Sequence, residues 1–187
     1  MKVFRSLNEF ASYSENQGTA LTIGCFDAVH KGHQILIEAL IKEAQLKKLS
    51  SAVMLFENHP LSLLRPEKAP PMIHSIKQRI RLFSKLGIDS IILQSFDKSF
   101  SELSAEEFTS ILENQIKVRF LLLGFDFHFG KNRKGNYEYL KNNAPNFEFA
   151  QLDPLHFEGK RISSSEIRSE IKLGNMDLVS EMLGQAY

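Results

Sequence analysis

The sequence predicts an α/β fold built on a parallel sheet with helices on both faces. Short apolar runs alternate along the chain with segments in which apolar residues recur at helical spacing. The predicted strands cover residues 20–23, 51–56, 89–93, 119–123 and 147–152. In sheets of this kind the ligand sits beyond the carboxyl ends of the strands. The loops that follow these runs are therefore the candidate functional segments.

The first half of the chain begins with a predicted short strand and helix before Gly18. Residues 15–18 carry a turn signal that leads into the first core strand. A helix is expected from about His33 to Leu49, where Ile35, Leu36, Ala39 and Leu40 recur at helical spacing. The continuous apolar run 51–56 is typical of a buried parallel strand. Residues 61–72 lack a helical period and are expected to form a long loop.

Capping residues predict where the later helices begin and end. A helix over 75–86 is closed by Gly87, the usual residue for a left-handed C-cap. Ser104 to Glu107 forms a capping box that opens another helix, and Ser163 to Glu166 forms a second. Asn175 is expected to cap a last short helix that ends near Gly184.

Composition describes an ordinary globular protein. The 187 residues are 43% apolar, the net charge is +1, and Cys25 is the single cysteine. One cysteine excludes an internal disulfide framework and a cysteine-based zinc cluster. The balanced charge favours neither nucleic acid nor an anionic membrane as a partner. No apolar run suits a signal core or a membrane span. We therefore expect one cytoplasmic domain over residues 1–187.

The stretch from Leu21 to Gln34 has the strongest functional signal. An apolar run stops at Gly24, a polar loop carries His30 and His33, and apolar periodicity resumes at Ile35. A helix N-terminus offers unpaired N–H groups and the positive end of the helix dipole, which suits a phosphate. Gly32 would let a phosphate approach the backbone, and both imidazoles can donate hydrogen bonds.

Two common phosphate motifs are absent from this stretch, the P-loop and the dinucleotide fingerprint. The alternative interpretations of His30 and His33 are a pair of surface histidines or a pair of metal ligands.

Two later loops join this one at the carboxyl edge of the predicted sheet. Asn58-His59-Pro60 follows the second core strand and is either a simple turn or part of the site. The segment 124–130 alternates phenylalanine with polar residues between two glycines. It is either a strand with one buried aromatic face or a glycine-hinged loop that binds a planar ring, with Asp126 directed at a metal or a hydroxyl.

A second anion site is predicted where Ser163, Ser164 and Ser165 open a helix. Arg168 lies within about a turn and a half of the first serine, and its guanidinium can fork onto phosphate oxygens. The alternative is an N-cap with a surface arginine. Two anion-binding helix starts in one α/β domain favour a polyphosphate held between them.

The motifs together resemble a known family. The pattern His-x-Gly-His after a strand resembles the nucleotidylyltransferase superfamily. The whole set resembles bacterial FAD synthetases, the FMN adenylyltransferase module of bifunctional riboflavin kinase/FMN adenylyltransferases. The segments that carry the resemblance are 24–34, 56–60, 103–108, 124–130, 161–168 and 183–187. Departures from the family pattern are Cys25, Ala28, Asn58 and Ser165, which stand where asparagine, glycine, proline and threonine are usual.

The resemblance implies a Rossmann-like nucleotidylyltransferase fold and the transfer of AMP from ATP to FMN, giving FAD and pyrophosphate. Catalysis would rest on His30, His33 and Arg168. The residues implied in ATP binding are Gly24, Phe26, Asp27, Gly32, Arg161, Ser163, Ser164 and Ser165. Those implied in flavin binding are Phe56, His59, Pro60, Phe125, Asp126, Phe127 and Phe129.

Mg²⁺ is the implied cofactor, bridging the phosphates with Asp126 as its protein ligand. The partners implied are ATP, FMN and a riboflavin kinase, which is either a further domain or a separate enzyme. Two other interpretations stay open. One is a related nucleotidylyltransferase with a different phosphorylated acceptor, and the other is a flavin- or nucleotide-binding module without turnover.

Overall fold

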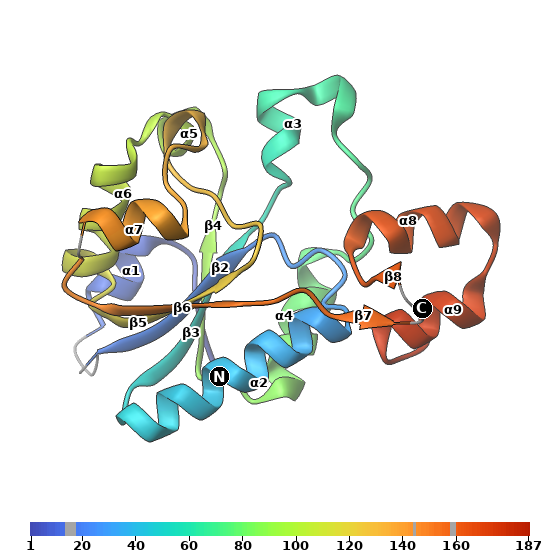
Figure 1. Cartoon of the computed structure of the whole chain (residues 1–187), viewed down its shortest axis with the longest axis horizontal. Helices are drawn as coiled ribbons and strands as arrows, with labels where there is room; N and C mark the ends of the chain where they lie inside the picture. Colours follow the sequence, from blue (N-terminus) through green and yellow to red (C-terminus); the bar gives the residue numbers. More distant parts are fainter. Residues whose placement is uncertain (14–17, 144, 158–159) are drawn as a thin grey trace.

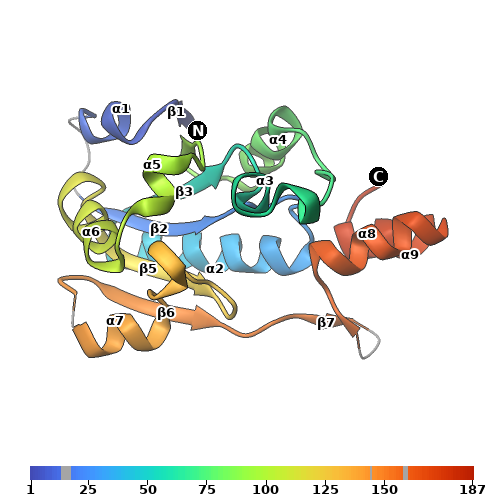
Figure 2. The same cartoon turned by 90° about the horizontal axis from the view of Figure 1, so that it is seen from above.

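The computed structural model describes residues 1–13, 18–143, 145–157 and 160–187, so the predicted turn at 15–17 lies outside the described residues. Six parallel strands form one sheet in the order β1-β4-β3-β2-β5-β6. Helices cover both faces of the sheet, as Figures 1 and 2 show. The predicted fold class is therefore confirmed.

The strands of the sheet are β1 (Lys2–Phe4), β2 (Thr19–Gly24), β3 (Ser50–Phe56), β4 (Ser90–Gln94), β5 (Val118–Gly124) and β6 (Glu148–Leu152). A separate antiparallel pair is formed by β7 (His156–Phe157) and β8 (Lys160–Arg161). The α-helices are α1 (Leu7–Ala11), α2 (Lys31–Lys47), α3 (Pro60–Leu64), α4 (Ile76–Leu86), α5 (Lys98–Glu102), α6 (Ala105–Ser110), α7 (Tyr137–Asn143), α8 (Ser164–Leu173) and α9 (Met176–Leu183). Shorter helical turns are η1 (Pro66–Lys68), the π-helical η2 (Ile111–Gln115) and η3 (Lys131–Arg133).

Two cores lie against the two faces of the sheet. Alternate residues of each strand point to opposite faces, so Met54 and Phe56 join one core while Val53 and Leu55 join the other. The first core includes side chains of α1, α6 and η2, and the second includes those of α2 and α4. Both faces are apolar because both are covered, as expected for a parallel sheet.

The strand order places a topological switch point at β2. Strand β2 pairs with β3 on one side and with β5 on the other, and the chain reaches these neighbours in opposite directions across the sheet. Ligands of open α/β sheets bind in the crevice outside such a point. Gly24 ends β2 and Gly124 ends β5, so the two glycine-marked loops of the sequence flank this crevice.

A third cluster fixes the C-terminal helices beside the site. Val179, Met182 and Leu183 of α9 pack with Ile162 and Ile167 at the start of α8. The Gln34 side-chain amide donates to the carbonyls of Val29 (2.9 Å) and Leu183 (2.8 Å). The start of α8 is thereby held next to the start of α2. Among the described residues, no helix combines the length and apolar character needed to span a bilayer.

Several predicted elements differ in the structure. Helix α2 begins at Lys31 rather than near His33, and Ile35 is 40% exposed. The expected loop 61–72 contains α3 and η1. The Gly87 C-cap and the Ser104 capping box are confirmed, and Ser163 caps α8 by accepting the Glu166 N–H. Asn175 makes no side-chain cap, and its amide donates to Glu170 Oε2 (2.6 Å) instead.

Gly130 provides a test of how the loop after β5 is positioned. Gly130 has φ +72° and Gly174 has φ +77°, a conformation that disfavours any side chain. A Cβ at Gly130 would also lie 2.7 Å from the Ala105 backbone, whereas a Cβ at Gly174 would meet nothing within 4 Å.

We expect Gly174→Ala to lower the free energy of unfolding by about 1 kcal/mol and Gly130→Ala by about 2 kcal/mol more. Urea denaturation of both variants measures the difference. Equal losses would contradict the close approach of the loop to α6.

Candidate active site

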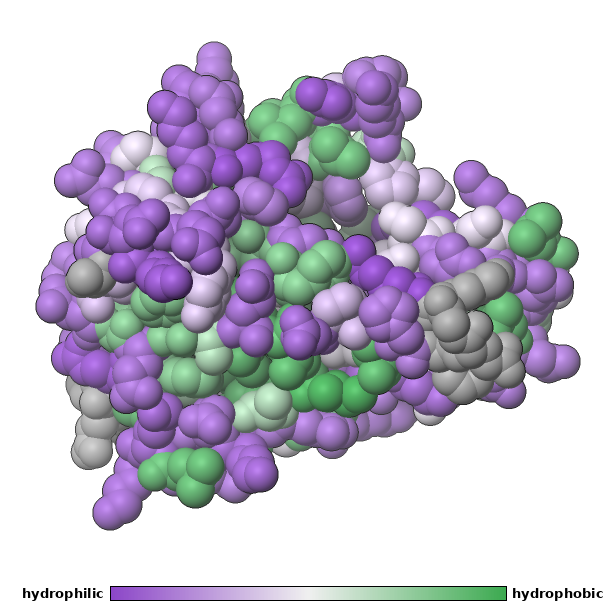
Figure 3. All heavy atoms as spheres, viewed as in Figure 1, coloured by the Kyte–Doolittle hydropathy of each residue, from purple (hydrophilic) through white to green (hydrophobic). Residues whose placement is uncertain are grey.

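A cleft of about 1010 Å³ opens at the carboxyl edge of the sheet. Figure 3 shows a hollow on this face below α3, with apolar residues of α3 at its rim. All the residues assigned to catalysis or binding from the sequence line this cleft. Residues of the loop after β4, of α5 and of η3 line it as well. The structure thus brings the predicted site residues together, while their individual roles stay predictions.

His30 and His33 form a stacked pair at the start of α2. Their ring centroids lie 3.6 Å apart with the planes inclined by 15°. His30 is the N-cap of α2, and its Nδ1 accepts the His33 backbone N–H (3.3 Å). The neutral His30 ring therefore carries its proton on Nε2. Among the described residues, no group bonds to the buried Nδ1 of His33.

Both rings are neutral near pH 7. Burial, reinforced by the positive charge of Arg161, lowers the pKa of His30 from 6.5 to about 4. Burial, with the neighbouring His30, places the pKa of His33 well below its usual value. Each ring can therefore donate one hydrogen bond, and fixed positive charge in the cleft comes from arginine and lysine instead.

Gly32 and Phe26 pack against the two histidine rings. A Cβ at position 32 would lie 3.2 Å from His30 Cε1 and Nδ1, so Gly32 accommodates the His30 ring. The buried Phe26 ring meets the His33 ring edge-on with centroids 5.0 Å apart. Phe26 also has φ +45° and Val29 has φ +44°, so the loop between β2 and α2 is strained.

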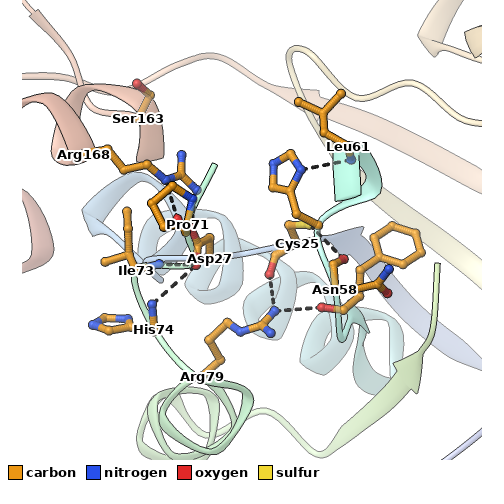
Figure 4. Close-up of polar contacts among 12 residues, drawn as sticks. Cys25, Asp27, Asn58, Leu61, Pro71, Ile73, His74, Arg79, Ser163 and Arg168 are labelled. Atoms are coloured by element: carbon orange, nitrogen blue, oxygen red, sulfur yellow. Dashed lines mark hydrogen bonds and ion pairs between the residues drawn. The ribbon is translucent and has the colours of Figure 1, made fainter. Parts of the chain in front are cut away.

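Asp27 anchors the site from inside. Its side chain is 2% exposed, Oδ1 accepts the Ile73 N–H (2.9 Å) and the His74 N–H (3.4 Å), and Oδ2 is ion-paired with Arg168 Nη2. Arg168 Nε also donates to the Pro71 carbonyl (2.9 Å). Figure 4 shows these contacts converging from three segments. Asp27 thus holds the loop, the chain before α4 and Arg168 together, and its expected ATP contact stays a prediction. Arg168 keeps only part of its guanidinium free for a ligand.

A buried arginine joins the ends of two strands. Arg79 of α4 is 1% exposed, and its Nη1 donates to the carbonyls of Cys25 (2.8 Å) and Phe56 (2.7 Å). Its Nη2 donates to the Glu57 carbonyl (2.9 Å). One guanidinium therefore donates hydrogen bonds to the backbone carbonyls at the carboxyl ends of both β2 and β3 (Figure 4). Sequence reasoning missed Arg79, although it lies on the helical stripe of Ile76, Ile80 and Phe83 and so faces the core.

The second helix start carries a solvent-exposed ion pair. Arg161 Nη2 lies 2.9 Å from Asp126 Oδ2, and the Arg161 guanidinium stacks 3.9 Å from the Phe125 ring centroid. Ser163 caps α8 by accepting the Glu166 N–H (3.2 Å). Ser164 and Ser165 follow in the first turn of α8. The polar half of the cleft thus combines two helix starts with two arginines.

The other half of the cleft is aromatic. Phe56, Phe96 and Phe100 contact one another with ring centroids 5.5 to 5.8 Å apart, and we call these three rings the aromatic wall. All three line the cleft, and sequence reasoning missed Phe96 and Phe100. His59 caps α3 by accepting the Leu61 N–H on Nδ1 (3.1 Å), with Pro60 as the first helical residue.

The segment 124–130 is a loop that begins at the end of β5 and not a strand, so the strand interpretation is wrong. Phe129 is buried in the core against Phe108 and Tyr139, although it also lines the cleft. Phe125 and Phe127 are half-buried at the cleft.

The residues of this cleft do not form a magnesium site of their own. Among the described residues, no group of three or more His, Cys, Asp or Glu side chains is placed to hold a metal. Asp126, the expected protein ligand, is paired with Arg161. The donor set therefore fits a magnesium ion only as one carried by the phosphates of a nucleotide.

Solved structures with similar folds define the class of protein. Pantothenate synthetase from Thermus thermophilus superposes with a TM-score of 0.63 at 14% identity, over 95% of this chain and 72% of that one. A crystal structure described as a macrolide-efflux protein from Streptococcus pneumoniae superposes with a TM-score of 0.83 at 26% identity, over 99% of this chain and 62% of that one. The fold is thus the α/β fold of nucleotidylyltransferase-like proteins.

The sequence places the chain more narrowly. The family model for FAD synthetase matches residues 12–166, and the chain belongs to the FAD synthetase family. Bifunctional riboflavin kinase/FMN adenylyltransferases are 37% identical in Buchnera aphidicola and 34% identical in Escherichia coli, in each case over 100% of this chain and 60% of the relative. The chain therefore spans about 60% of the length of these curated relatives.

Arg79 should be required for stability. In Arg79→Met, three strand-end carbonyls lose a charged donor, and we expect the free energy of unfolding to fall by about 3 kcal/mol. Arg81 is exposed on the same helix, so Arg81→Met should change it by less than about 0.5 kcal/mol. Urea denaturation of the two variants measures both values. A similar small effect in both would contradict the contacts described for Arg79.

The buried His30 should make stability depend on pH. The folded protein resists protonation of His30 down to about pH 4, whereas the unfolded chain takes up the proton near pH 6.5. The unfolded state therefore binds more protons in this window, and the free energy of unfolding falls as the pH falls, by about 3 kcal/mol across the window for this one group.

His30→Asn keeps an N-cap acceptor and removes the titration, so its stability should fall less steeply between pH 7 and pH 5. Denaturant titrations at the two pH values give the slopes. Equal slopes in the variant and the parent chain would refute the assignment.

Proposed function

We propose that this chain transfers AMP from ATP to FMN, giving FAD and pyrophosphate. The observation that carries the proposal is the division of one cleft into two halves. Two helix starts with arginines and paired histidines lie in one half, and the aromatic wall lies in the other. A nucleotide polyphosphate suits the first half and a planar flavin suits the second. Membership of the FAD synthetase family supports the same conclusion.

On the nucleotide side, the α-phosphate would lie at the start of α2. His30 and His33 would donate hydrogen bonds to its oxygens as negative charge develops. The β- and γ-phosphates would lie against the start of α8, held by the serine hydroxyls and Arg161. The Arg161–Asp126 pair is exposed, so it contributes little to stability and a phosphate can take over the guanidinium. The remaining donors of Arg168 would serve the same phosphates while Asp27 holds its position.

On the acceptor side, the isoalloxazine ring would stack on the aromatic wall, with Phe125 and Phe127 at its edge. The phosphate of FMN is already ionised near pH 7 and needs no strong base. It would attack the α-phosphorus in line while pyrophosphate leaves. Catalysis then consists of positioning and electrostatic stabilisation, as in phosphoryl transfer generally. ATP would bring its own Mg²⁺, a hard cation that phosphate oxygens bind well.

We further propose that residues 1–187 make up the adenylyltransferase domain and that a riboflavin kinase supplies FMN. The relatives are named for both activities, and this chain corresponds to about 60% of their length. The supplier is either a further domain or a separate enzyme.

The proposal is tested by chromatography of the products formed from FMN, ATP and Mg²⁺. Removal of a donor to the developing charge in His33→Ala should lower turnover by about a hundredfold or more. His156→Ala should retain normal turnover, because the His156 side chain is exposed and does not line the cleft.

Parallel reactions separate the alternatives. FAD from FMN and ATP supports the proposal, and product from CTP with FMN would indicate a related transferase of different specificity. Binding of FMN and ATP without release of pyrophosphate would indicate a binding module. Near-normal turnover in His33→Ala would overturn the role given to the histidine pair.

A further inference from the structure

Asn58 makes a paired contact that the reaction itself does not use. Its Oδ1 accepts the Phe96 backbone N–H (2.8 Å), and its Nδ2 donates to the Phe96 carbonyl (3.0 Å). Both polar ends of one side-chain amide thus bind the backbone of a single residue 38 positions away. The amide nitrogen also lies 3.5 Å from Ser62 Oγ in α3.

The contact continues the sheet beyond the ends of its strands. Strands β3 and β4 pair in parallel as far as Phe56 and Gln94, and the Glu57 N–H donates to the Gln94 carbonyl (3.0 Å). One step further on, the Asn58 side chain replaces backbone as the partner of Phe96. An amide side chain can do this because it presents a donor and an acceptor like those of a peptide group.

The backbone held in this way carries a ring of the aromatic wall. Phe96 is half-buried, and its ring meets the Phe56 ring edge-on with centroids 5.5 Å apart and planes at 87°. Phe96 also contacts Phe100 (5.8 Å). Phe56 itself belongs to the core and ends β3, so its position is set by the sheet. Phe96 lies in a loop between β4 and α5, and the two bonds from Asn58 fix its backbone.

Asn58 is held firmly enough to act as such a support. Its backbone carbonyl accepts the Cys25 thiol (3.7 Å), and burial raises the pKa of that thiol to about 12, so it remains a donor. The preceding carbonyls, those of Phe56 and Glu57, are bound by Arg79. Figure 4 shows Cys25 and Asn58 close together on the side of the site to which Arg79 reaches.

We propose that Asn58 is a positioning residue that sets the affinity of the cleft for the flavin ring, by holding Phe96 against Phe56. The proposal rests on the proposed function only for the identity of the ring. It assigns to Asn58 no contact with the phosphates and no part in the chemical step. Its effect should therefore appear in flavin binding and be absent from ATP binding.

The test is a double-mutant cycle read by titration of riboflavin and FMN fluorescence. Asn58→Ala should weaken both flavins by the same factor, about tenfold for two neutral hydrogen bonds, because the two ligands share the ring and differ in the phosphate. The dissociation constant of ATP should not change. Asn58→Asp, which sets an oxygen against the Phe96 carbonyl, should weaken flavin binding in the same direction.

The double-mutant cycle distinguishes a positioning role of Asn58 from a general loss of structure in the variants. Phe96→Leu should also weaken flavin binding, and adding Asn58→Ala to it should cause no further loss, because Asn58 acts through the Phe96 ring. Asn114→Ala is the matched control, since Asn114 is exposed and its amide bonds only Ser110 Oγ (3.1 Å) among the contacts of its side chain in the described chain. This control should bind both flavins as the parent chain does.

The outcomes distinguish this proposal from the proposed function. Unchanged flavin affinity in Asn58→Ala and Asn58→Asp, an additive loss in the double variant, or failure of the parent chain to bind flavin would each overturn it. If the parent chain binds flavin and forms no FAD, the proposed function fails while the titrations still decide the role of Asn58.

Discussion

The buried carboxylate of Asp27 is the contact on which the arrangement of the site depends. A charge that is 2% exposed is tolerated only when it is paired and hydrogen-bonded, and Asp27 finds its partners in two segments other than its own. These are the chain entering α4 at Ile73 and His74, and Arg168 on α8. The surrounding loop has two residues with positive φ that are not glycine. Such strain persists where neighbouring contacts over-determine the backbone, and here the Asp27 carboxylate acts together with Gln34 and Arg79, which bind the Val29 and Cys25 carbonyls.

The two histidines of the first loop stabilise the start of α2 and also present hydrogen-bond donors to the cleft. As N-cap, His30 gives its Nδ1 lone pair to the helix, which leaves Nε2–H as its donor. Stacking and burial keep both rings neutral, so they can stabilise an anion without repelling the nearby arginines. Positive charge is supplied separately by the guanidinium groups of Arg161 and Arg168, which both line the cleft. The cleft thus separates the functions of charge and of hydrogen-bond donation between different residue types.

Much of the fold could be predicted because parallel strands and helices have strong local patterns. The strand runs, the Gly87 cap and the Ser104 capping box follow from residue types within a few positions of one another. The strand order could not be predicted, since the pairing of β1 with β4 depends on contacts far apart in sequence. The early start of α2 and the whole of α3 were missed because histidine caps both helices, and histidine is not a usual capping residue. The members of the site came from loop motifs. Arg79 lies on an apolar helical stripe, but its partners are backbone carbonyls that no residue pattern reveals, and the bonds that hold Phe96 likewise involve its backbone.

The two halves of the cleft are built by different means, and this bears on how an acceptor is chosen. In the proposed function, phosphates would lie at the starts of α2 and α8, where helix N-termini offer unpaired N–H groups. The flavin ring would lie against the loops after β3, β4 and β5, and a contact such as that between Asn58 and Phe96 fixes the backbone of one of them. A structure that shares this fold at 14% identity shows that the sheet architecture persists when most of the sequence differs. If the proposed function holds, the choice of acceptor would depend on these loops more than on the sheet.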